Sequence, residues 1–469
     1  MTRLARTFLL MTLATVLAAG GPASAGAAPP PIKHVWIVVL ENENASASFG
    51  PQSEAPYLAR TLTSQGVSLP NYFATTHLSL GNYIALVSGQ ASNPQTQSDC
   101  QLFTEFTPGL IDEEGQAVGQ GCVYPGAVKT VANQLTEKGL GWKGYMEDMG
   151  NNPAQSSTCR HPAIGARDDT QSAKVGDQYA ARHNPFVYFH SIIDTPMCGQ
   201  RDVPLDRLPG DLASASGTPS YSFITPNLCN DGHDEPCKDG RPGGLRSADA
   251  FLRTWIPRIT GSPAYRDGGL VIVTFDEAEA GPGGGADSSA CCDQRPGPNT
   301  PSPGGPTPGP GGGRIGAVLL SPYVKPGTVS TAQYNHYSLL RSTEDIFGLG
   351  HLGYAAQAGL RAFGSDVFSA TGGRARRDRL APRLRVTGVP RRRCVRRSFR
   401  ARVRVREGSR LRRGALFRDR RRLRSTRKKR YSVVVRPGRL RRGRHAVRVV
   451  AVDAAGNRRT LTRRFVRCR

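Results

Sequence analysis

The sequence predicts an α/β fold with a doubly wound, mostly parallel sheet, followed by a small all-β sandwich. Three observations predict this fold. Short, continuous apolar runs such as residues 34–40 alternate with helix-like stretches through residue 347. From residue 384 onward the pattern changes to short segments in which apolar and polar residues alternate. The net charge changes sign between these two parts, so we expect two differently charged modules in one chain.

The first module has the pattern of strands that alternate with helices. Continuous apolar, β-branched runs, which are typical of strands buried on both faces, occur at residues 34–40, 186–189, 221–225, 270–275 and 317–320. Helix-like stretches lie between them at residues 79–87, 127–138, 248–259 and 338–347. Residues 281–313 are dominated by glycine and proline and predict a surface loop within this domain.

The second module has the pattern of a sandwich. Period-two segments occur at residues 384–387, 399–405, 431–435, 445–452 and 460–465, and Cys394 and Cys468 bracket them. At 469 residues the chain exceeds one typical core. We therefore predict a larger catalytic domain over residues 28–372, a linker at 373–383, and an arginine-rich, immunoglobulin-like sandwich at 384–469.

The N-terminus predicts export from the cell. Arg3 and Arg6 precede an apolar run and then small residues, which is the pattern of a secretory signal peptide over residues 1–27. The run is shorter than the roughly 20 residues that a membrane span needs. The ten cysteines then predict disulfides, paired within residues 100–292 and within 394–468. A zinc site is the alternative, but no pair of CxxC knuckles is present. We expect a secreted, extracellular protein.

Three predicted strand ends offer groups that could hold a metal ion. In doubly wound sheets, ligands bind beyond the carboxyl ends of the strands. Carboxylate and amide oxygens in such positions suit a divalent cation. An isolated acidic pair is more often a helix cap or a solvated loop, yet here three strand ends share the pattern. Their residues are Glu41 and Asn42, then Asp231 and His233, then Asp276 and Glu277.

A nucleophile candidate lies in the segment from Thr75 to Tyr83. Ser79 is predicted to open a helix, where free N–H groups and the helix dipole favour an anion such as phosphate. The alternative is an ordinary N-cap serine. Thr76 is the second choice as nucleophile. His336 precedes an amphipathic helix, where a lone histidine is commonly a capping or packing residue.

Taken together and in this order, these segments resemble the bacterial phosphoesterase family of phospholipase C and acid phosphatase enzymes, within the alkaline phosphatase superfamily. The resemblance spans about residues 34–352. It implies an alkaline-phosphatase-like fold and one or two divalent metal ions as cofactor. It implies that Ser79 is nucleophile and ligand, that Glu41, Asn42, Asp276 and Glu277 hold the ion, and that His77, Asp231, His233 and His336 surround the phosphate or a second ion.

The implied reaction is hydrolysis of a phosphoric ester. A cation stabilises the alkoxide of a serine, which is otherwise a poor nucleophile. Ser79 would form a phosphoseryl enzyme, and the amide of Asn82 and one or more histidines would meet charge on the phosphate oxygens. Asp231 would either orient a histidine or bind metal. A sulfatase is disfavoured because Ser79-Leu-Gly-Asn-Tyr lacks the C/S-x-P-x-R motif. The alternative from another class is a non-catalytic surface-binding protein built on a degenerate enzyme domain.

The C-terminal module is strongly basic. Residues 374–469 hold 39 Lys and Arg against 4 Asp and Glu, a net charge of +35, which leaves −8 for the rest of a chain whose total is +27. Such a surface attracts polyanions, so an anionic cell wall or lipid surface is a candidate partner beside the phosphate-ester substrate. A merely solvated basic surface is an equal alternative. Few aromatic residues accompany the arginines, which disfavours a specific nucleic-acid reader.

Overall fold

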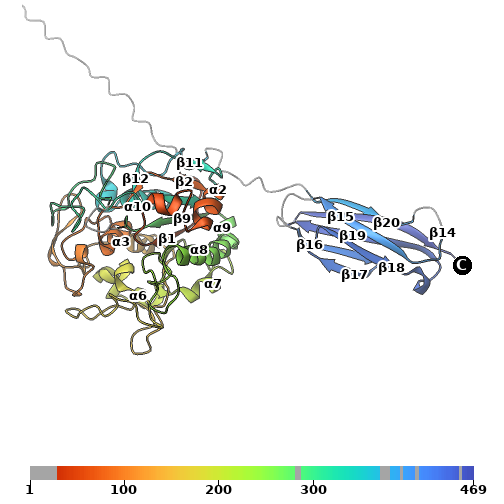
Figure 1. Cartoon of the computed structure of the whole chain (residues 1–469), viewed down its shortest axis with the longest axis horizontal. Coiled ribbons are helices and arrows are strands. Elements are labelled where there is room, and N and C mark those ends of the chain that lie inside the picture. Colours follow the sequence, from red (N-terminus) through yellow and green to blue (C-terminus); the bar gives the residue numbers. More distant parts are fainter. Residues whose placement is uncertain are drawn as a thin grey trace, which may run out of the picture. The chain divides into compact units, whose positions relative to one another are not determined.

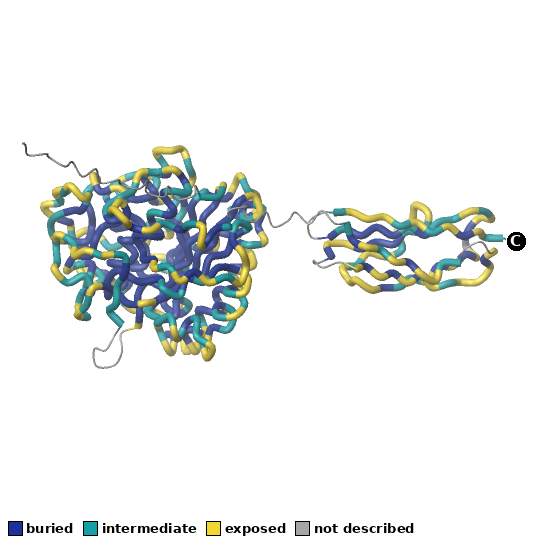
Figure 2. Tube along the Cα trace, turned by 90° about the horizontal axis from the view of Figure 1, so that it is seen from above, coloured by how far each residue is buried: buried dark blue, intermediate teal, exposed yellow. Residues whose placement is uncertain are grey.

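The computed structural model describes residues 29–279, 287–369, 381–390, 394–406, 411–453 and 457–468. The chain divides into two compact units, residues 1–370 and 371–469, each with its own core (Figures 1 and 2). The predicted signal peptide at 1–27 and the predicted linker up to residue 380 lie outside the described residues. Within the described part of the chain, no helix combines the length and the hydropathy that crossing a bilayer requires.

The larger unit is built on a mostly parallel sheet. Strands β9 (Gly269–Phe275), β1 (His34–Leu40), β8 (Tyr221–Thr225), β6 (Trp142–Met146) and β7 (Asp202–Pro204) run parallel to one another, whereas β10 (Ala317–Leu320) pairs antiparallel with β9 and with β2 (Val67–Leu69). Every residue of β1 and β9 is buried, as expected for strands covered on both faces. In sheet order the strands are β11 (Thr328–Val329), β2 (Val67–Leu69), β10 (Ala317–Leu320), β9 (Gly269–Phe275), β1 (His34–Leu40), β8 (Tyr221–Thr225), β6 (Trp142–Met146) and β7 (Asp202–Pro204).

Helices surround this sheet (Figure 1). The helices α3, α4 and α10 contact one another, and α8 contacts α9. The four predicted helices are present. The helix predicted at 127–138 starts four residues later, as α4, and the one predicted at 248–259 starts four residues earlier, as α8. The α-helices are α1 (Ala45–Phe49), α2 (Thr63–Gln65), α3 (Ser79–Ser88), α4 (Val131–Glu137), α5 (His190–Ile193), α6 (Met197–Arg201), α7 (Leu208–Asp211), α8 (Gly244–Thr260), α9 (Pro263–Arg266) and α10 (His336–Phe347).

One predicted strand is wrong. The apolar run at 186–189 lies almost wholly within a short 3-10 helix, η4 (Pro185–Tyr188). Pro185 explains the difference, because its fixed φ suits the first turn of a helix and it has no N–H to offer a strand ladder. A strand that the sequence did not reveal, β6, instead takes the place beside β8.

The glycine- and proline-rich segment is ordered where it is described, over residues 287–313. Its last glycines pair with the segment that precedes α3: the N–H of Gly312 donates to the carbonyl of Ala74, and the N–H of Ala74 donates to the carbonyl of Gly313. A Cβ at position 312 would lie 2.0 Å from the carbonyl oxygen of Thr76, so only glycine fits there. This segment therefore supports the backbone that leads to Ser79.

The cysteines form disulfides within the two predicted blocks. The pairs are Cys100–Cys122, Cys159–Cys198, Cys229–Cys237, Cys291–Cys292 and Cys394–Cys468. Two pairs lie beside an aspartate, Asp202 and Asp239, in groups whose residue types could hold a metal. Because both sulfurs of each group are bonded to each other, they cannot act as thiolate ligands, and the zinc alternative is not supported.

The C-terminal unit consists of two sheets, antiparallel except for one short edge strand, with a shared apolar core. One sheet has the order β13 (Arg383–Thr387), β15 (Phe399–Arg406), β18 (Arg430–Val435). The other has the order β14 (Cys394–Val395), β20 (Arg458–Arg467), β19 (Gly443–Asp453), β16 (Leu411–Arg418), β17 (Arg421–Thr426), with β14 parallel to β20. The period-two prediction is confirmed for five strands, while β14, β16 and β17 were not predicted.

Candidate active site

The carboxyl ends of β9, β1 and β8 bring the predicted acidic residues to one edge of the sheet. Leu40 and Phe275 are paired in register, so Glu41 and Asp276 leave the sheet side by side. The N–H of Glu41 donates to the carbonyl of Asp231 at 2.9 Å, which joins the third strand end to the other two. Three distant segments therefore converge, as predicted from the positions of the apolar runs.

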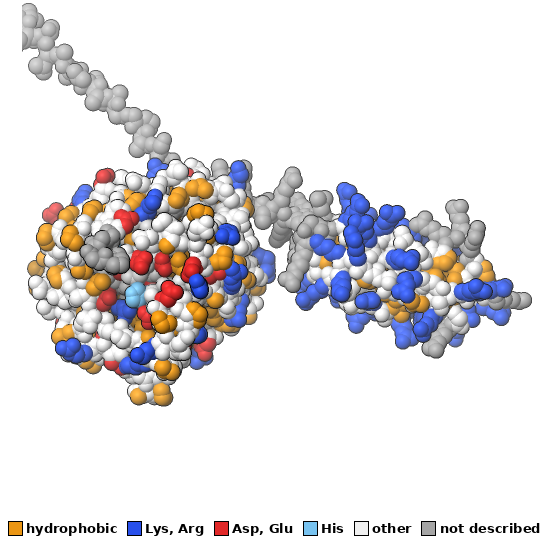
Figure 3. Space-filling model, in the orientation of Figure 1, with side chains coloured by type: hydrophobic (Ala, Val, Ile, Leu, Met, Phe, Trp, Pro, Cys, Tyr) orange, Lys and Arg blue, Asp and Glu red, His pale blue; other side chains and the backbone are white. Residues whose placement is uncertain are grey.

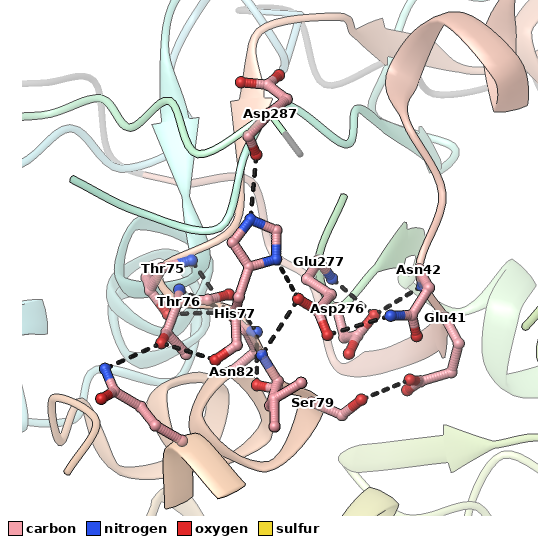
Figure 4. A network of polar contacts seen from close by, with 12 residues as sticks. Glu41, Asn42, Thr75, Thr76, His77, Ser79, Asn82, Asp276, Glu277 and Asp287 are labelled. Carbon is pink, nitrogen blue, oxygen red and sulfur yellow. Dashed lines mark hydrogen bonds and ion pairs between the residues drawn. The ribbon is translucent and has the colours of Figure 1, made fainter. Parts of the chain in front are cut away.

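Ser79 is the first residue of α3, and its side chain faces this edge (Figure 4). Its Oγ donates a hydrogen bond to Glu41 Oε2 at 2.8 Å instead of capping the helix. The preceding residue, Leu78, has φ +60°, a left-handed conformation that is costly for a bulky side chain. Asp99 accepts the N–H of Leu80 at 2.9 Å and so stabilises the helix start from outside. The N-cap alternative is therefore wrong, and the strained turn aims the hydroxyl at Glu41.

Glu41 is buried and is surrounded by donors. The hydroxyl of Tyr83, one turn further along α3, donates to its second oxygen, Oε1. His183 Nε2 lies 3.3 Å from Oε2, and the His183 ring stacks on Tyr83 with 5.3 Å between centroids. Burial first, and the carboxylates of Asp276 and Asp231 next, hold the pKa of Glu41 well above its usual range.

The two acidic residues that follow β9, Asp276 and Glu277, have different hydrogen-bond partners. Asp276 Oδ1 accepts the N–H groups of Asn42 at 3.0 Å and of Glu277 at 2.6 Å. Glu277 accepts from the Asn42 amide at 3.1 Å and from the N–H of Leu78 at 3.2 Å, and it pairs with His77 Nδ1. Glu277 thus fixes both the turn after β1 and the strained turn before Ser79 (Figure 4). Burial raises the pKa of Glu277 to about 7.

Asp231 lies close to two histidines, His183 and His233. Its Oδ1 accepts the N–H of His233 at 3.0 Å, and its Oδ2 lies 3.7 Å from His183 Nδ1. Burial raises the pKa of Asp231 to about 7. The side chain of His233 is half exposed and pairs with Asp234 at 2.9 Å, so this histidine lies at the outside of the cluster.

The residues present fit a divalent cation. Glu41, Asp231, Asp276 and Glu277 are each at most 2% exposed, and so much buried like charge needs a compensating positive charge. Among the described residues, Asp276 Oδ2, Asp231 Oδ2 and both ring nitrogens of His183 have no hydrogen-bond partner. Burial also holds the pKa of His183 well below its usual range, which favours the neutral imidazole that a metal binds. Oxygen and imidazole donors of this kind suit Zn²⁺ or Mn²⁺.

Asn82 and Thr76 have positions that differ from the predicted roles. The Asn82 side-chain oxygen accepts from the N–H groups of Thr75 at 2.9 Å and Thr76 at 3.1 Å, and its NH₂ group donates to the carbonyls of Thr76 at 2.8 Å and Leu78 at 3.4 Å. Asn82 therefore holds the segment before Ser79 in place and has no free N–H for substrate oxygens. The hydroxyl of Thr76 donates to the carbonyl of His77 at 3.1 Å, so Ser79 and not Thr76 faces Glu41.

His336 also has a positioning contact. It is fully buried at the start of α10, with Nε2 2.6 Å from the carbonyl oxygen of Asp276 and Nδ1 3.2 Å from the hydroxyl of Tyr72. Burial lowers the pKa of His336 to about 4. Both ring nitrogens of His336 therefore have partners within the protein. The ring holds the backbone at the end of β9 in place and has no nitrogen free to bind a phosphate.

Several residues of the site were not predicted. His183 and Tyr83 contact Glu41 directly, and Arg182 lies with Nε 3.6 Å from Asp99 Oδ2. Arg182 and His183 belong to a short 3-10 helix, η3 (Ala181–His183), that does not follow a strand. The one available signal was the Arg-His-Asn-Pro sequence directly before a buried aromatic run.

Comparisons with known proteins show the family to which the chain belongs. The model of the Phosphoesterase family matches residues 51–350. A phosphatidylinositol-3-phosphatase of Mycobacterium tuberculosis is 27% identical over 334 residues, which cover 71% of this chain and 83% of that protein. An acid phosphatase of Aspergillus fumigatus is 26% identical over 323 residues, 68% of this chain, but the match spans only 55% of the fungal protein.

Among solved structures, a protein of the alkaline phosphatase superfamily from Vibrio parahaemolyticus aligns over 93% of this chain and 84% of its own, with 12% identity and a TM-score of 0.40. The family model, in contrast, covers well over half of the present sequence and includes Ser79, Asp231, Asp276 and Glu277. This chain therefore belongs to the Phosphoesterase family, and the class of reaction follows from that membership: hydrolysis of a phosphoric ester.

Proposed function

We propose that this protein is a secreted, metal-dependent phosphatase in which Ser79 attacks phosphorus and carries the phosphoryl group as a covalent intermediate. The observation that supports the proposal most is the contact between Ser79 Oγ and Glu41 Oε2 at the start of α3, within a cluster of buried carboxylates. The five disulfides favour an oxidising, extracellular compartment.

The side chains of this chain have distinct tasks in the proposal. Glu41, Asp231, Asp276 and His183 would hold the cation, and Asn42 and Glu277 would support them. When bound, a divalent ion supplies the positive charge that stabilises a serine alkoxide and a pentacoordinate phosphate. His77 was predicted to surround the phosphate, but its Nδ1 pairs with Glu277 and its Nε2 lies 3.2 Å from the carbonyl oxygen of Asp287. His77 is therefore given a positioning role, beside the turn before Ser79.

The chemical steps conserve atoms and charge. Ser79 Oγ passes its proton to Glu41 Oε2, to which it already donates, and forms a bond to phosphorus in line with the leaving oxygen. The bond from phosphorus to that oxygen breaks, and the leaving oxygen takes up the proton. The N-terminal N–H groups of α3 and the nearby guanidinium of Arg182 favour the anionic phosphate. Water then attacks phosphorus, the Ser79–phosphorus bond breaks, one proton of the water restores the Ser79 hydroxyl, and inorganic phosphate leaves.

The M. tuberculosis relative is named for a phosphomonoester of a lipid, and the fungal relatives are named acid phosphatases. We therefore propose a phosphomonoester as the preferred substrate class. A panel of p-nitrophenyl phosphate, bis(p-nitrophenyl) phosphate and p-nitrophenyl phosphocholine, assayed with Zn²⁺, Mn²⁺ or Mg²⁺ supplied, should show the monoester hydrolysed fastest and EDTA abolishing turnover. Preference for a diester would contradict the substrate class without affecting the nucleophile.

The nucleophile is tested separately. Acid-quenched enzyme should carry one phosphoryl group on the peptide that contains Ser79, and Ser79→Ala should lose both this adduct and turnover. Ser88→Ala is the matched control, because Ser88 lies buried on the same helix and its hydroxyl donates to the carbonyl of Ile84. An active Ser79→Ala protein would refute the assignment, and inactivity of the wild type on the whole panel with metals supplied would favour a binding protein built on this domain.

A further inference from the structure

The middle strand of the three-stranded sheet presents a straight row of arginines to solvent. In β15, Ala401, Val403 and Val405 are buried, while the residues between them are exposed. Side chains two residues apart along a strand are separated by about 6.6 Å and point to the same face. The outward residues of β15 are Arg400, Arg402, Arg404 and Arg406.

The neighbouring strands extend this row sideways. Arg385 of β13 and Arg430 of β18 both pair with Arg404, so three arginines stand level across the three strands. Arg383 pairs with Arg406 in the same way. All of these positions are exposed. We call the seven residues Arg383, Arg385, Arg400, Arg402, Arg404, Arg406 and Arg430 the arginine track.

The track lacks compensating negative charge among the described residues. The C-terminal unit offers two described carboxylates: Asp419 pairs with His445, and Asp453 is buried and bonds to Asn457. Like charges that stand directly opposite on neighbouring strands destabilise a sheet. Positive side chains cover much of the visible surface of this unit in Figure 3. Because these arginines repel one another, the binding of a polyanion would stabilise the surface.

The shape and composition of the track favour one kind of polyanion. Four arginines in line match a chain with repeated anionic groups, and guanidinium groups bind phosphate in two-point contacts. The outward positions of the three strands hold no aromatic side chain for stacking bases, and Val434 is the one exposed apolar residue among them. The track is therefore a poor match for nucleic acid, which needs aromatic side chains for stacking, and for insertion into a membrane, which needs exposed apolar side chains.

We propose that the arginine track binds a linear phosphate polymer that carries no bases, such as a phosphodiester chain of a cell envelope, and thereby concentrates the enzyme where that polymer occurs. The remaining arginines of the unit contribute general attraction, while the track provides the aligned contacts. This role is independent of catalysis, and it makes the C-terminal unit a targeting module.

Binding of long-chain inorganic polyphosphate to the full-length Ser79→Ala protein tests the proposal, since this background avoids turnover of the probe. The variant Arg385→Gln, Arg404→Gln, Arg430→Gln removes the level row. Its affinity should fall at least tenfold, and the slope of log K against log salt should fall by about 2 to 3, because each phosphate contact contributes roughly 0.7 to 0.9. The midpoint of thermal unfolding should stay equal or rise, because the repulsion across the strands is relieved.

The matched control removes three exposed arginines of the other sheet, Arg412→Gln, Arg421→Gln and Arg464→Gln, for the same change in net charge. This control should keep polyphosphate binding within about threefold. Equal weakening by both triple variants would show that net charge alone binds the polymer and would overturn the proposal. Tighter binding to phosphatidylglycerol vesicles or to a single-stranded oligonucleotide than to polyphosphate would overturn it as well.

Discussion

Replacing Tyr83 with phenylalanine tests how the orientation of Glu41 affects the reaction. Tyr83 is fully buried and its hydroxyl donates to Glu41 Oε1, while Ser79 donates to Oε2 of the same carboxylate. The substitution removes one oxygen atom and keeps the ring stacked on His183. Its effect should therefore come from a lost donor and not from a cavity.

The magnitude follows from that single contact. A hydrogen bond to a charged group contributes about 1.5–3 kcal/mol, and each 1.4 kcal/mol is about tenfold in rate. We expect kcat/KM for p-nitrophenyl phosphate to fall roughly 10- to 100-fold in Tyr83→Phe. Tyr145→Phe is the matched control, because its hydroxyl donates to Asp211 at 2.7 Å outside the site and its loss should leave the rate within about twofold.

Parallel thermal unfolding should show that both tyrosine variants remain folded at the assay temperature. A Tyr83→Phe enzyme with the rate of the wild type would show that the carboxylate of Glu41 does not depend on this donor. An equal loss in Tyr145→Phe would also refute it, because the effect would be a general one on the fold.

Four further predictions concern stability and the support of the site. Asn82→Ala leaves two buried N–H groups unpaired, at about 1–3 kcal/mol each, so chemical denaturation should show a loss of roughly 2–6 kcal/mol together with lower activity; unchanged stability would contradict the positioning role. Gly312→Ala should lower both the unfolding midpoint and the rate, whereas Gly210→Ala, which adds a Cβ into open space, should change neither; equal behaviour of the two would argue against the close contact at Thr76. Breaking Cys394–Cys468 with serines should destabilise the C-terminal unit by about 4 kcal/mol, from the 74-residue separation, without changing turnover of small esters; calorimetry that finds the unit equally stable would count against this. Burial raises the pKa of Asp202 to about 7, so its ionisation destabilises the fold progressively as the pH rises from about 4 to 7; Asp202→Asn should gain stability relative to wild type, up to roughly 4 kcal/mol at pH 8 and almost nothing at pH 3.5, and a gain that does not depend on pH would rule this cause out.

The sequence predicted those site residues whose position depends only on the direction of the strands. Glu41, Asp231 and Asp276 each follow an apolar strand, and parallel strands bring their carboxyl ends to one edge. Ser79 was found because a helix start is recognisable from its neighbours. These local signals do not depend on which strands are adjacent, so they remained valid once the sheet order β9–β1–β8 was known.

The remaining residues depend on tertiary contacts that no local pattern records. His183 reaches Glu41 from a 3-10 helix, and Tyr83 reaches it from the face of α3 that points at the sheet. Asn82 lies three residues after Ser79 in sequence, yet its side-chain amide is hydrogen-bonded to the backbone of Thr75 and Thr76. Its closeness to the nucleophile in sequence predicted that Asn82 binds the phosphate, but its packing gives it the role of positioning the backbone.

The fold shows the same division. Continuous apolar runs predicted β1, β8, β9 and β10, but the run after Pro185 formed a 3-10 helix because proline cannot join a ladder. In the sandwich, β17 was not predicted because none of its residues is buried and its sequence therefore has no apolar alternation. Edge strands of this kind pair through their backbone, which the sequence pattern does not reveal.

The metal content of the purified protein decides whether the buried carboxylates and His183 bind a divalent cation. Elemental analysis after dialysis without chelator should find one or two divalent ions per chain in the wild type. The Asp276→Asn variant should contain at least one ion fewer, because it loses the carboxylate whose Oδ2 has no hydrogen-bond partner among the described residues. The wild type should also unfold at a higher temperature when Zn²⁺ or Mn²⁺ is added after EDTA treatment. A wild-type protein that retains no ion, and whose unfolding midpoint does not respond to any of these metals, would contradict the account.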